Sequence, residues 1–332
     1  MKKILKYSKY AVITFITITG LYLINLFLMK PISIDHYLGK EVVMEMLDTP
    51  ETLTYLGILD SFNFITNHQS KLSDEGLEDL EEGLEEMKQA KKTLERYNDS
   101  KLSQQQSITK KIALYDLNNN IKQQEQFPFH SYPLNQIGGL HLNTIQFMTD
   151  IHPIRSNSEA AAYIDRLNML DEVFESKMEI LNAQKEAGIF PPEFVFDHVI
   201  RQLTEFLDSS KGSNPIRDVF QRKISEIDLS EKAQAELMND LDAAMQDSVK
   251  PGFKRLLGFM METLPMANPN DGVWSLPNGD EYYALRLKAQ TTTDYTAEEI
   301  HNIGLSEVDR ISKRMQAILS ELKYGDNLNV GE

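Results

Sequence analysis

Amphipathic helical periodicity is the feature of this sequence that most limits how the chain can fold. From residue 77 to residue 94, large apolar side chains recur at steps of three, four or seven, and similar stripes return in most later segments. The members of this first stripe are Leu77, Leu80, Leu84, Met87 and Leu94. No segment shows the sustained alternation of apolar and polar residues that a half-buried strand requires. The sequence therefore predicts a mainly α-helical fold.

Helix start and stop signals divide the chain after residue 100. A polar helix is expected over residues 101–126, and Ser156 with Glu159 has the spacing of a capping box that opens a long helix ending at Gly188. The apolar stripe expected on this long helix includes Tyr163, Leu167 and Phe174. Further helices are expected over 193–208, 215–227 and 230–249, with Pro251 starting a separate helix that ends near residue 264, and a second capping box at Thr296–Glu299. The many acids on the helix around residues 74–86 indicate a solvated face and do not indicate a cation site.

Residues 127–153 combine three prolines and a Gly-Gly pair with many apolar and aromatic residues. We expect this segment to be irregular, to pack against the helices and to line a cleft. Asn135, Gln136 and His141 are its candidate substrate-cleft residues. Its three histidines, at 130, 141 and 152, lack the i, i+4 spacing of a helical zinc site. That spacing favours structural, hydrogen-bonded histidines.

The first thirty residues predict a membrane anchor. Four lysines precede an uncharged run from Tyr10 to Met29, whose 20 residues are enough helix to cross a bilayer. Lysines before such a run are expected to stay cytoplasmic, which places residues 31–332 in the periplasm or outside the cell as one extracytoplasmic helical domain. A signal peptide that is cleaved to release a secreted protein is the alternative, and a buried core helix is a third interpretation.

Charge and cysteine content exclude several classes of function. The chain has 332 residues, a formal net charge of −16 and no cysteine. An acidic surface disfavours nucleic acid, since neutralising phosphates requires clustered Lys and Arg. Without cysteine, disulfides, thiol nucleophiles and Cys-based zinc sites are absent.

Residues 272–310 contain the densest group of distinctive side chains. The only Trp of the chain lies here, followed by a Pro-Asn-Gly turn, the pair Tyr282 and Tyr283, and a Thr-Thr-Thr-Asp run. One of the two tyrosines can point into a cavity, since adjacent helical residues point about 100° apart. His301 is expected within reach of Glu298, where a carboxylate can orient an imidazole. Tyr282, Tyr283 and His301 complete the set of candidate cleft residues.

The order of these motifs resembles the bacterial domain of unknown function 885 family. The residues that show it are G-x-W-x-L-P-x-G-x-x-Y-Y from Gly272, T-T-T-D from Thr291 and E-E-I-H-x-x-G-L from Glu298, with P-L-N-Q-I-G-G-L and D-I-H-P-I upstream. The similarity covers roughly residues 45–332. It implies a helical scaffold of the zinc-metallopeptidase type, usually exported or membrane-attached, with zinc on an H-E-x-x-x-G-H-H helix.

This chain departs from the family pattern at the zinc motif. None of its seven histidines begins H-E-x-x-H. The resemblance therefore implies the N-terminal part of a metallopeptidase-like domain, truncated or split, without bound cofactor and not catalytic alone, with a second chain as one source of the missing half. The alternative is a complete binding or scaffold protein that holds a peptide in a helical cleft. A third hypothesis is metal-free acid–base catalysis by His301, Glu298 and a tyrosine.

Overall fold

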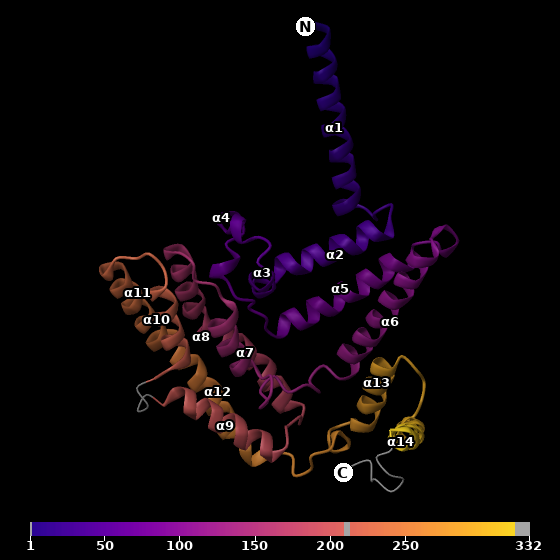
Figure 1. Cartoon of the computed structure of the whole chain (residues 1–332), viewed down its shortest axis with the longest axis vertical. Helices are drawn as coiled ribbons and strands as arrows, with labels where there is room; N and C mark the ends of the chain where they lie inside the picture. Colours follow the sequence, from indigo (N-terminus) through magenta and orange to yellow (C-terminus); the bar gives the residue numbers. More distant parts are fainter. Residues whose placement is uncertain (1, 209–212, 323–332) are drawn as a thin grey trace. The chain divides into compact units, whose positions relative to one another are not determined.

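A computed structural model describes residues 2–208 and 213–322, and it confirms the mainly helical class (Figure 1). No strand forms in these two ranges, where the only β-type pairing is an isolated bridge between Pro192 and Asn268. The chain forms two compact units that meet in sequence at Asp271 and Gly272. The helices of the first unit are α1 (Lys2–Leu28), α2 (Ile34–Asp48), α3 (Pro50–Leu56), α4 (Asn63–Thr66), α5 (Leu77–Glu95), α6 (Gln104–Gln126), α7 (Leu140–Gln146), α8 (Asn157–Glu186), α9 (Glu193–Leu207), α10 (Pro215–Ser225), α11 (Glu231–Ala244) and α12 (Lys250–Thr263).

The larger apolar core of the first unit is built around α8. The stripe expected on this helix is buried, and Tyr163, Leu167 and Phe174 have no exposed surface. Phe174 packs against Phe253 of α12, which in turn stacks on Phe206 of α9 with ring centroids 4.1 Å apart. Figure 1 shows α8, α9 and α12 packed together. Burial of these large side chains, each contributing about 1.5–3 kcal/mol, is the main stabilising term in this core.

A smaller core joins α2 to α5 and α6. Ile34 and Tyr37 of α2 cluster with Leu94 of α5 and with Tyr97, which follows α5. The Tyr97 hydroxyl donates to the Pro31 carbonyl at 2.7 Å and so ties the start of α2 to the end of α5. Helices α5 and α6 pack against each other, and Figure 1 shows them diverging away from the loop that connects them.

The helix caps follow the sequence signals closely. Thr296 and Glu299 form a reciprocal capping box, with Glu299 N–H donating to the Thr296 hydroxyl oxygen at 3.2 Å and Thr296 N–H to the Glu299 carboxylate at 2.7 Å. Ser156 caps α8 as predicted, since its hydroxyl accepts from Glu159 N–H. The return bond goes elsewhere, because the Glu159 carboxylate accepts from the backbone N–H of Arg155.

Pro251 lies in the first turn of α12, as the sequence predicted, but no loop separates α12 from α11. Helices α11 and α12 are continuous through a π-helical turn, η6 (Met245–Val249). A proline in a helix leaves the carbonyl four residues earlier without a donor. Here the N–H of Lys250 donates to the Met245 carbonyl five residues back, and this wider turn carries the chain past Pro251 without ending the helix.

The expectation that residues 127–153 are irregular is wrong for their second half. The segment is irregular only up to Gly139, after which α7 and a second π-helical turn, η4 (Phe147–Ile151), follow. Gly139 is required where the helix begins, since a Cβ there would lie 2.5 Å from the carbonyl oxygen of Asn135. The apolar residues after Gly139 thus lie on a helical wall, while Leu134 of the irregular half also packs into the core.

Helix α1 contains the uncharged run. Its described apolar side chains are largely exposed, with Phe15, Ile16 and Leu21 each more than 60% accessible. Asn25 uses its side chain to hold the turn after the helix, accepting from Ile32 N–H at 3.0 Å and donating to the Lys30 carbonyl. Among the helices of the described ranges, none is both long enough and apolar enough to span a membrane. The expected transmembrane helix therefore has no support from the structure.

The second unit contains a short 3₁₀ turn, η8 (Val273–Ser275), and helices α13 (Gly279–Thr291) and α14 (Ala297–Glu321). Asn278 takes the left-handed conformation predicted for the turn, with φ of 52°. Gly279 begins α13 with an ordinary φ, and it must be glycine because a Cβ would lie 2.0 Å from the Val273 carbonyl oxygen. The apolar stripe of α14 is exposed in this unit, with Val308 63% accessible.

Candidate functional site

The site with the strongest case for ligand binding is a pocket of about 460 Å³ in the first unit. Its walls come from α3, the loop after Ser70, helices α7 and α8, and the π-helical turn η4. Its lining residues are Glu51, Tyr55, Leu72, Ser73, Glu75, Leu140, Asn143, Thr144, Gln146, Phe147, Met148, Ile151, Leu170, Val173 and Lys177. A volume in this range suits a small ligand or one or two side chains of a peptide.

The chemistry of this pocket is an apolar interior with a polar mouth. Met148, Leu170 and Val173 are buried side chains of the interior. At the polar side, Lys177 pairs with Glu75 at 3.0 Å. The π-helical turn sets the direction of Phe147 and Met148, and such turns are frequent at functional sites.

Glu51 closes one edge of the pocket by holding the loop opposite α3. Its two carboxylate oxygens accept from the backbone N–H of Ser73 at 2.8 Å and from the Ser73 hydroxyl at 2.7 Å. Charge-assisted bonds of this kind are about twice as strong as neutral ones. The hydroxyl of Ser73 therefore serves to position the loop.

A fully buried arginine, Arg166, contacts the wall of the pocket on the side away from its interior. The guanidinium of Arg166 lies 4.8 Å from the ring centre of Phe147, which itself lines the pocket. Its N–H groups donate to carbonyls of Lys71 and His68, each at 2.7 Å, and to the Thr54 hydroxyl at 2.7 Å. Burial lowers the pKa of Arg166 to about 10, so the group stays charged at neutral pH. Arg166 thereby fastens the segment that carries α3 to helix α8.

His152 completes this buried network. Arg166 donates from Nη1 to Nδ1 of His152 at 2.7 Å, which leaves the imidazole proton on Nε2, facing the Glu159 carbonyl at 3.4 Å. Burial, followed by the nearby charge of Arg166, lowers the pKa of His152 well below its usual range. The interpretation of His152 as a structural, hydrogen-bonded histidine is consistent with this arrangement.

The candidates from the irregular segment lie beside this pocket in sequence but do not line it. His141 is buried, and its Nε2 lies 2.9 Å from Oε1 of Gln202 on α9. The amide nitrogen of Gln202 donates to the Gln136 carbonyl at 3.1 Å, so Oε1 is the acceptor and Nε2 of His141 carries the proton. Asn135 accepts from the N–H groups of Ile137 and Gly138 and shapes the turn. The structure thus brings Gln136 and His141 together through Gln202, as supports of the loop.

The other three candidates belong to the second unit. Tyr282 and Tyr283 are consecutive on α13, where Tyr283 is 47% exposed and Tyr282 is half-buried. His301 is exposed on α14. Within the part of the chain that the structure describes, no hydrogen bond or ion pair joins His301 to Glu298, so the expected orienting contact is absent there. These residues stay candidates without an observed catalytic arrangement.

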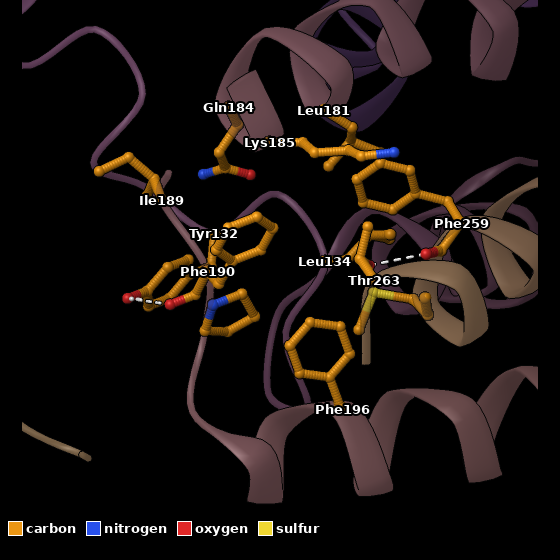
Figure 2. A pocket seen from close by; sticks show the side chains of 12 residues that line it. Tyr132, Leu134, Leu181, Gln184, Lys185, Ile189, Phe190, Phe196, Phe259 and Thr263 are labelled. Carbon is orange, nitrogen blue, oxygen red and sulfur yellow. Dashed lines mark hydrogen bonds between the residues drawn. The ribbon is translucent and has the colours of Figure 1, made fainter. Parts of the chain in front are cut away.

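A second, much smaller cavity lies between the irregular segment and the end of α8 (Figure 2). Tyr132, Gln184 and Phe196 are among the side chains around it, and its volume is about 20 Å³. The amide of Gln184 donates to the carbonyls of Phe129 and Ser131 and fixes the loop above the cavity. A space of this size holds about one water molecule and is too small for a substrate.

The described residues do not fit the zinc site that the resemblance implies. Over residues 2–208 and 213–322, no three His, Cys, Asp or Glu side chains gather in a way that could hold a metal ion. His141 and His152 are each committed to a hydrogen bond, with Gln202 and Arg166 respectively. No step of chemistry is therefore assigned to a metal here.

The pocket residues were not identified from the sequence because they come from segments up to 126 positions apart, Glu51 to Lys177. The sequence did contain one signal for the buried arginine behind the pocket. Arg166 occupies a position on the apolar stripe of α8, three residues after Tyr163 and four before Leu170. A charged residue at a core-facing position indicates a buried polar network.

Comparison with known proteins adds the following. The sequence matches the family described as "Bacterial protein of unknown function (DUF885)" over residues 50–330. The fold is similar to a crystal structure described as that of "the putative lipoprotein from Colwellia psychrerythraea", with a TM-score of 0.71 and 21% identity. That match covers 86% of this chain and 51% of the other, so the chain spans about half the length of the solved protein. No curated protein matches the sequence significantly.

Proposed function

Since this chain belongs to the DUF885 family of bacterial proteins, we propose that its first unit is a binding domain that holds an apolar side chain of a peptide. The observation that carries the proposal is the pocket of about 460 Å³ between α3, α7 and α8. Its interior is apolar and its mouth carries charges of both signs, in Glu51, Glu75 and Lys177. Ligand sites in proteins typically combine such an interior with a few polar groups that fix orientation.

The second candidate function is that of the N-terminal, non-catalytic part of a zinc-metallopeptidase-like domain. The match to about half of a longer solved protein supports it, and the family resemblance of the motifs from Gly272 onward points the same way. In this proposal the chain supplies a wall of a peptide cleft, and zinc is held by residues that are not among those described. Stoichiometric zinc in the purified chain together with peptidase turnover would rule it out.

For location, we infer an extracytoplasmic protein attached to a membrane through residues 10–29. The fold similarity to a protein described as a lipoprotein supports the extracytoplasmic side, and the exposed apolar side chains of α1 support contact with lipid. Removal of this segment as a signal peptide is the alternative, and the mass of the mature protein distinguishes the two. Replacing Ile16 and Leu21 with lysine should release the protein from membranes, whereas Ile137→Lys, at an apolar position outside α1 that is 85% exposed, should not.

The binding proposal is tested by saturation-transfer NMR with capped pentapeptides. Peptides with a central Leu or Phe should receive saturation from the protein, and the same peptide with a central Asp should receive little. Leu140→Trp places a large ring in the pocket and should abolish the signal. Ile137→Trp adds the same ring at a position 85% exposed and outside the pocket, and should leave the signal intact. An equal response of the two variants would show that the pocket is not the binding site.

A further inference from the structure

A larger groove, of about 930 Å³, lies in the first unit where α2, α5 and α6 meet. Apolar side chains from all three helices form its floor. They are Tyr37 and Leu38 of α2, Leu80, Met87, Ala90 and Leu94 of α5, and Ala113 and Leu117 of α6. Ile34, Tyr37 and Leu94 close one end by packing together in the smaller core. The groove is therefore formed by the packing of three helices and not by the conformation of a surface loop.

Carboxylates from α2, α5, α6 and the loop before α5 surround this floor. On α2, Glu41, Glu45 and Asp48 recur at steps of four and three, which puts them on one helix face. The other acidic lining residues are Asp74, Glu75, Asp79, Glu82, Glu86 and Asp116. Within the described part of the chain, no Lys or Arg lines the groove. Part of the acidic face that the sequence indicated as solvated thus borders an apolar floor.

Most of this negative charge is not neutralised. Glu41 pairs with Lys40 at 2.6 Å, and Glu75 pairs with Lys177. Asp79 accepts from the backbone N–H of Gly76. The remaining six carboxylates, of Glu45, Asp48, Asp74, Glu82, Glu86 and Asp116, form no ion pair with any residue that the structure describes. A groove lined by charge of one sign concentrates ligands of the opposite sign.

We propose that this groove binds a basic amphipathic helix. The apolar floor runs along α5 from Leu80 to Leu94, which corresponds to roughly 21 Å at about 1.5 Å per residue and matches a partner helix of about 14 residues. An amphipathic helix places an apolar stripe between two polar flanks. Lysines or arginines on those flanks would lie opposite the acids of α2 on one side and those of α5 on the other. Recognition of this kind is the helix-in-groove mode.

The test uses fluorescence anisotropy with a labelled 14-residue Leu/Lys amphipathic helix and the full-length protein. The same peptide with Glu in place of Lys, and a scrambled Leu/Lys peptide without an apolar face, are the peptide controls. The basic amphipathic peptide should bind, the acidic one should not, and the scrambled one should bind at least about tenfold more weakly because it cannot cover the floor. Binding should weaken as salt is raised, since exposed charges are screened.

Matched variants locate the site. Replacing Glu45, Glu82 and Glu86 with glutamine removes three unpaired groove charges and should lower affinity about tenfold. Replacing Glu78, Glu81 and Glu95 removes the same charge from α5 outside the groove and should change affinity less than about twofold. Equal effects of the two triple variants, equal binding of the acidic or scrambled peptide, or stoichiometric binding of Ca²⁺ that displaces the peptide would each overturn the proposal. Leu140→Trp, which blocks only the pocket of about 460 Å³, should leave this binding unchanged. The test can therefore contradict either proposal without contradicting the other.

Discussion

Arg166 and His152 form a buried pair in which the guanidinium donates to Nδ1 of the imidazole at 2.7 Å. Neither side chain has measurable exposed surface. No carboxylate lies within ion-pair distance of Arg166 among the described residues, so its charge is stabilised by carbonyl oxygens, a hydroxyl and an aromatic face. This pair links the segment that carries α3 to helix α8, and both elements form walls of the candidate pocket.

Replacing Arg166 with methionine should destabilise the first unit by about 3–5 kcal/mol, because several buried carbonyls lose their donor at once. The free energy of unfolding from urea titration measures this. Arg201→Met is the matched control, since Arg201 is on α9, is 58% exposed and pairs loosely with Glu205. Its change should stay within about 0.5 kcal/mol. A similar small change for Arg166 would show that the buried network is not stabilising.

Stability should fall as pH drops below the usual range of histidine, in part through His152. Burial lowers the pKa of His152 well below the usual range of histidine, so the unfolded chain binds a proton that the folded chain does not. Where the unfolded state binds more protons, stability rises with pH. The contribution is therefore fully present above about pH 6.5 and is lost progressively below it.

Urea titrations at pH 7.5 and pH 5.5 measure this dependence. In His152→Gln the loss of stability between the two pH values should be smaller than in the natural sequence, although the variant is less stable at pH 7.5. His198→Gln, which removes an exposed imidazole on α9, is the matched control and should keep the original loss. An unchanged loss in His152→Gln would contradict the assignment.

Two glycines of α12 should respond with opposite sign to alanine. A Cβ at Gly252 would lie 2.9 Å from a ring carbon of Phe174, which is fully buried and cannot move aside. Gly252→Ala should therefore cost about 1–3 kcal/mol through overpacking. At Gly258 no atom lies within 4 Å of the added carbon, so Gly258→Ala should stabilise the helix by about 0.5–1 kcal/mol. Thermal melting measures the change in stability of each variant. Changes of the same sign in the two variants would argue against this packing.

Gln202 should control the titration of His141. Burial lowers the pKa of His141, and the hydrogen bond to Gln202 opposes that effect in part. Gln202→Glu offers a charged acceptor to Nε2 and should raise this pKa, while Gln202→Leu leaves a buried N–H unpaired and should cost about 1–3 kcal/mol. Nitrogen-detected NMR of the imidazole reports both the pKa and the Nε2–H tautomer. A proton on Nδ1 in the natural sequence would refute the proposed orientation of the amide.

The sequence by itself determined the helices, because the apolar period and the caps are local signals. The stripe through Tyr163, Leu167 and Phe174 predicted the buried face of α8, and Thr296 with Glu299 predicted the start of α14. Local signals placed Pro251 correctly in the first turn of α12, but they did not show that a π-helical turn joins α12 to α11 without a break. They also failed at Leu140, where a helix follows a glycine pair.

The candidate site was decided only by the tertiary structure. The pocket needs Glu51, Phe147 and Lys177 to converge, and the acidic groove needs α2 to lie beside α5 and α6. Whether these residues and helices come together depends on which helix faces pack against each other, and the packing of the whole core determines that. Local patterns fix where each helix begins and ends, but long-range packing fixes which side chains share a cavity.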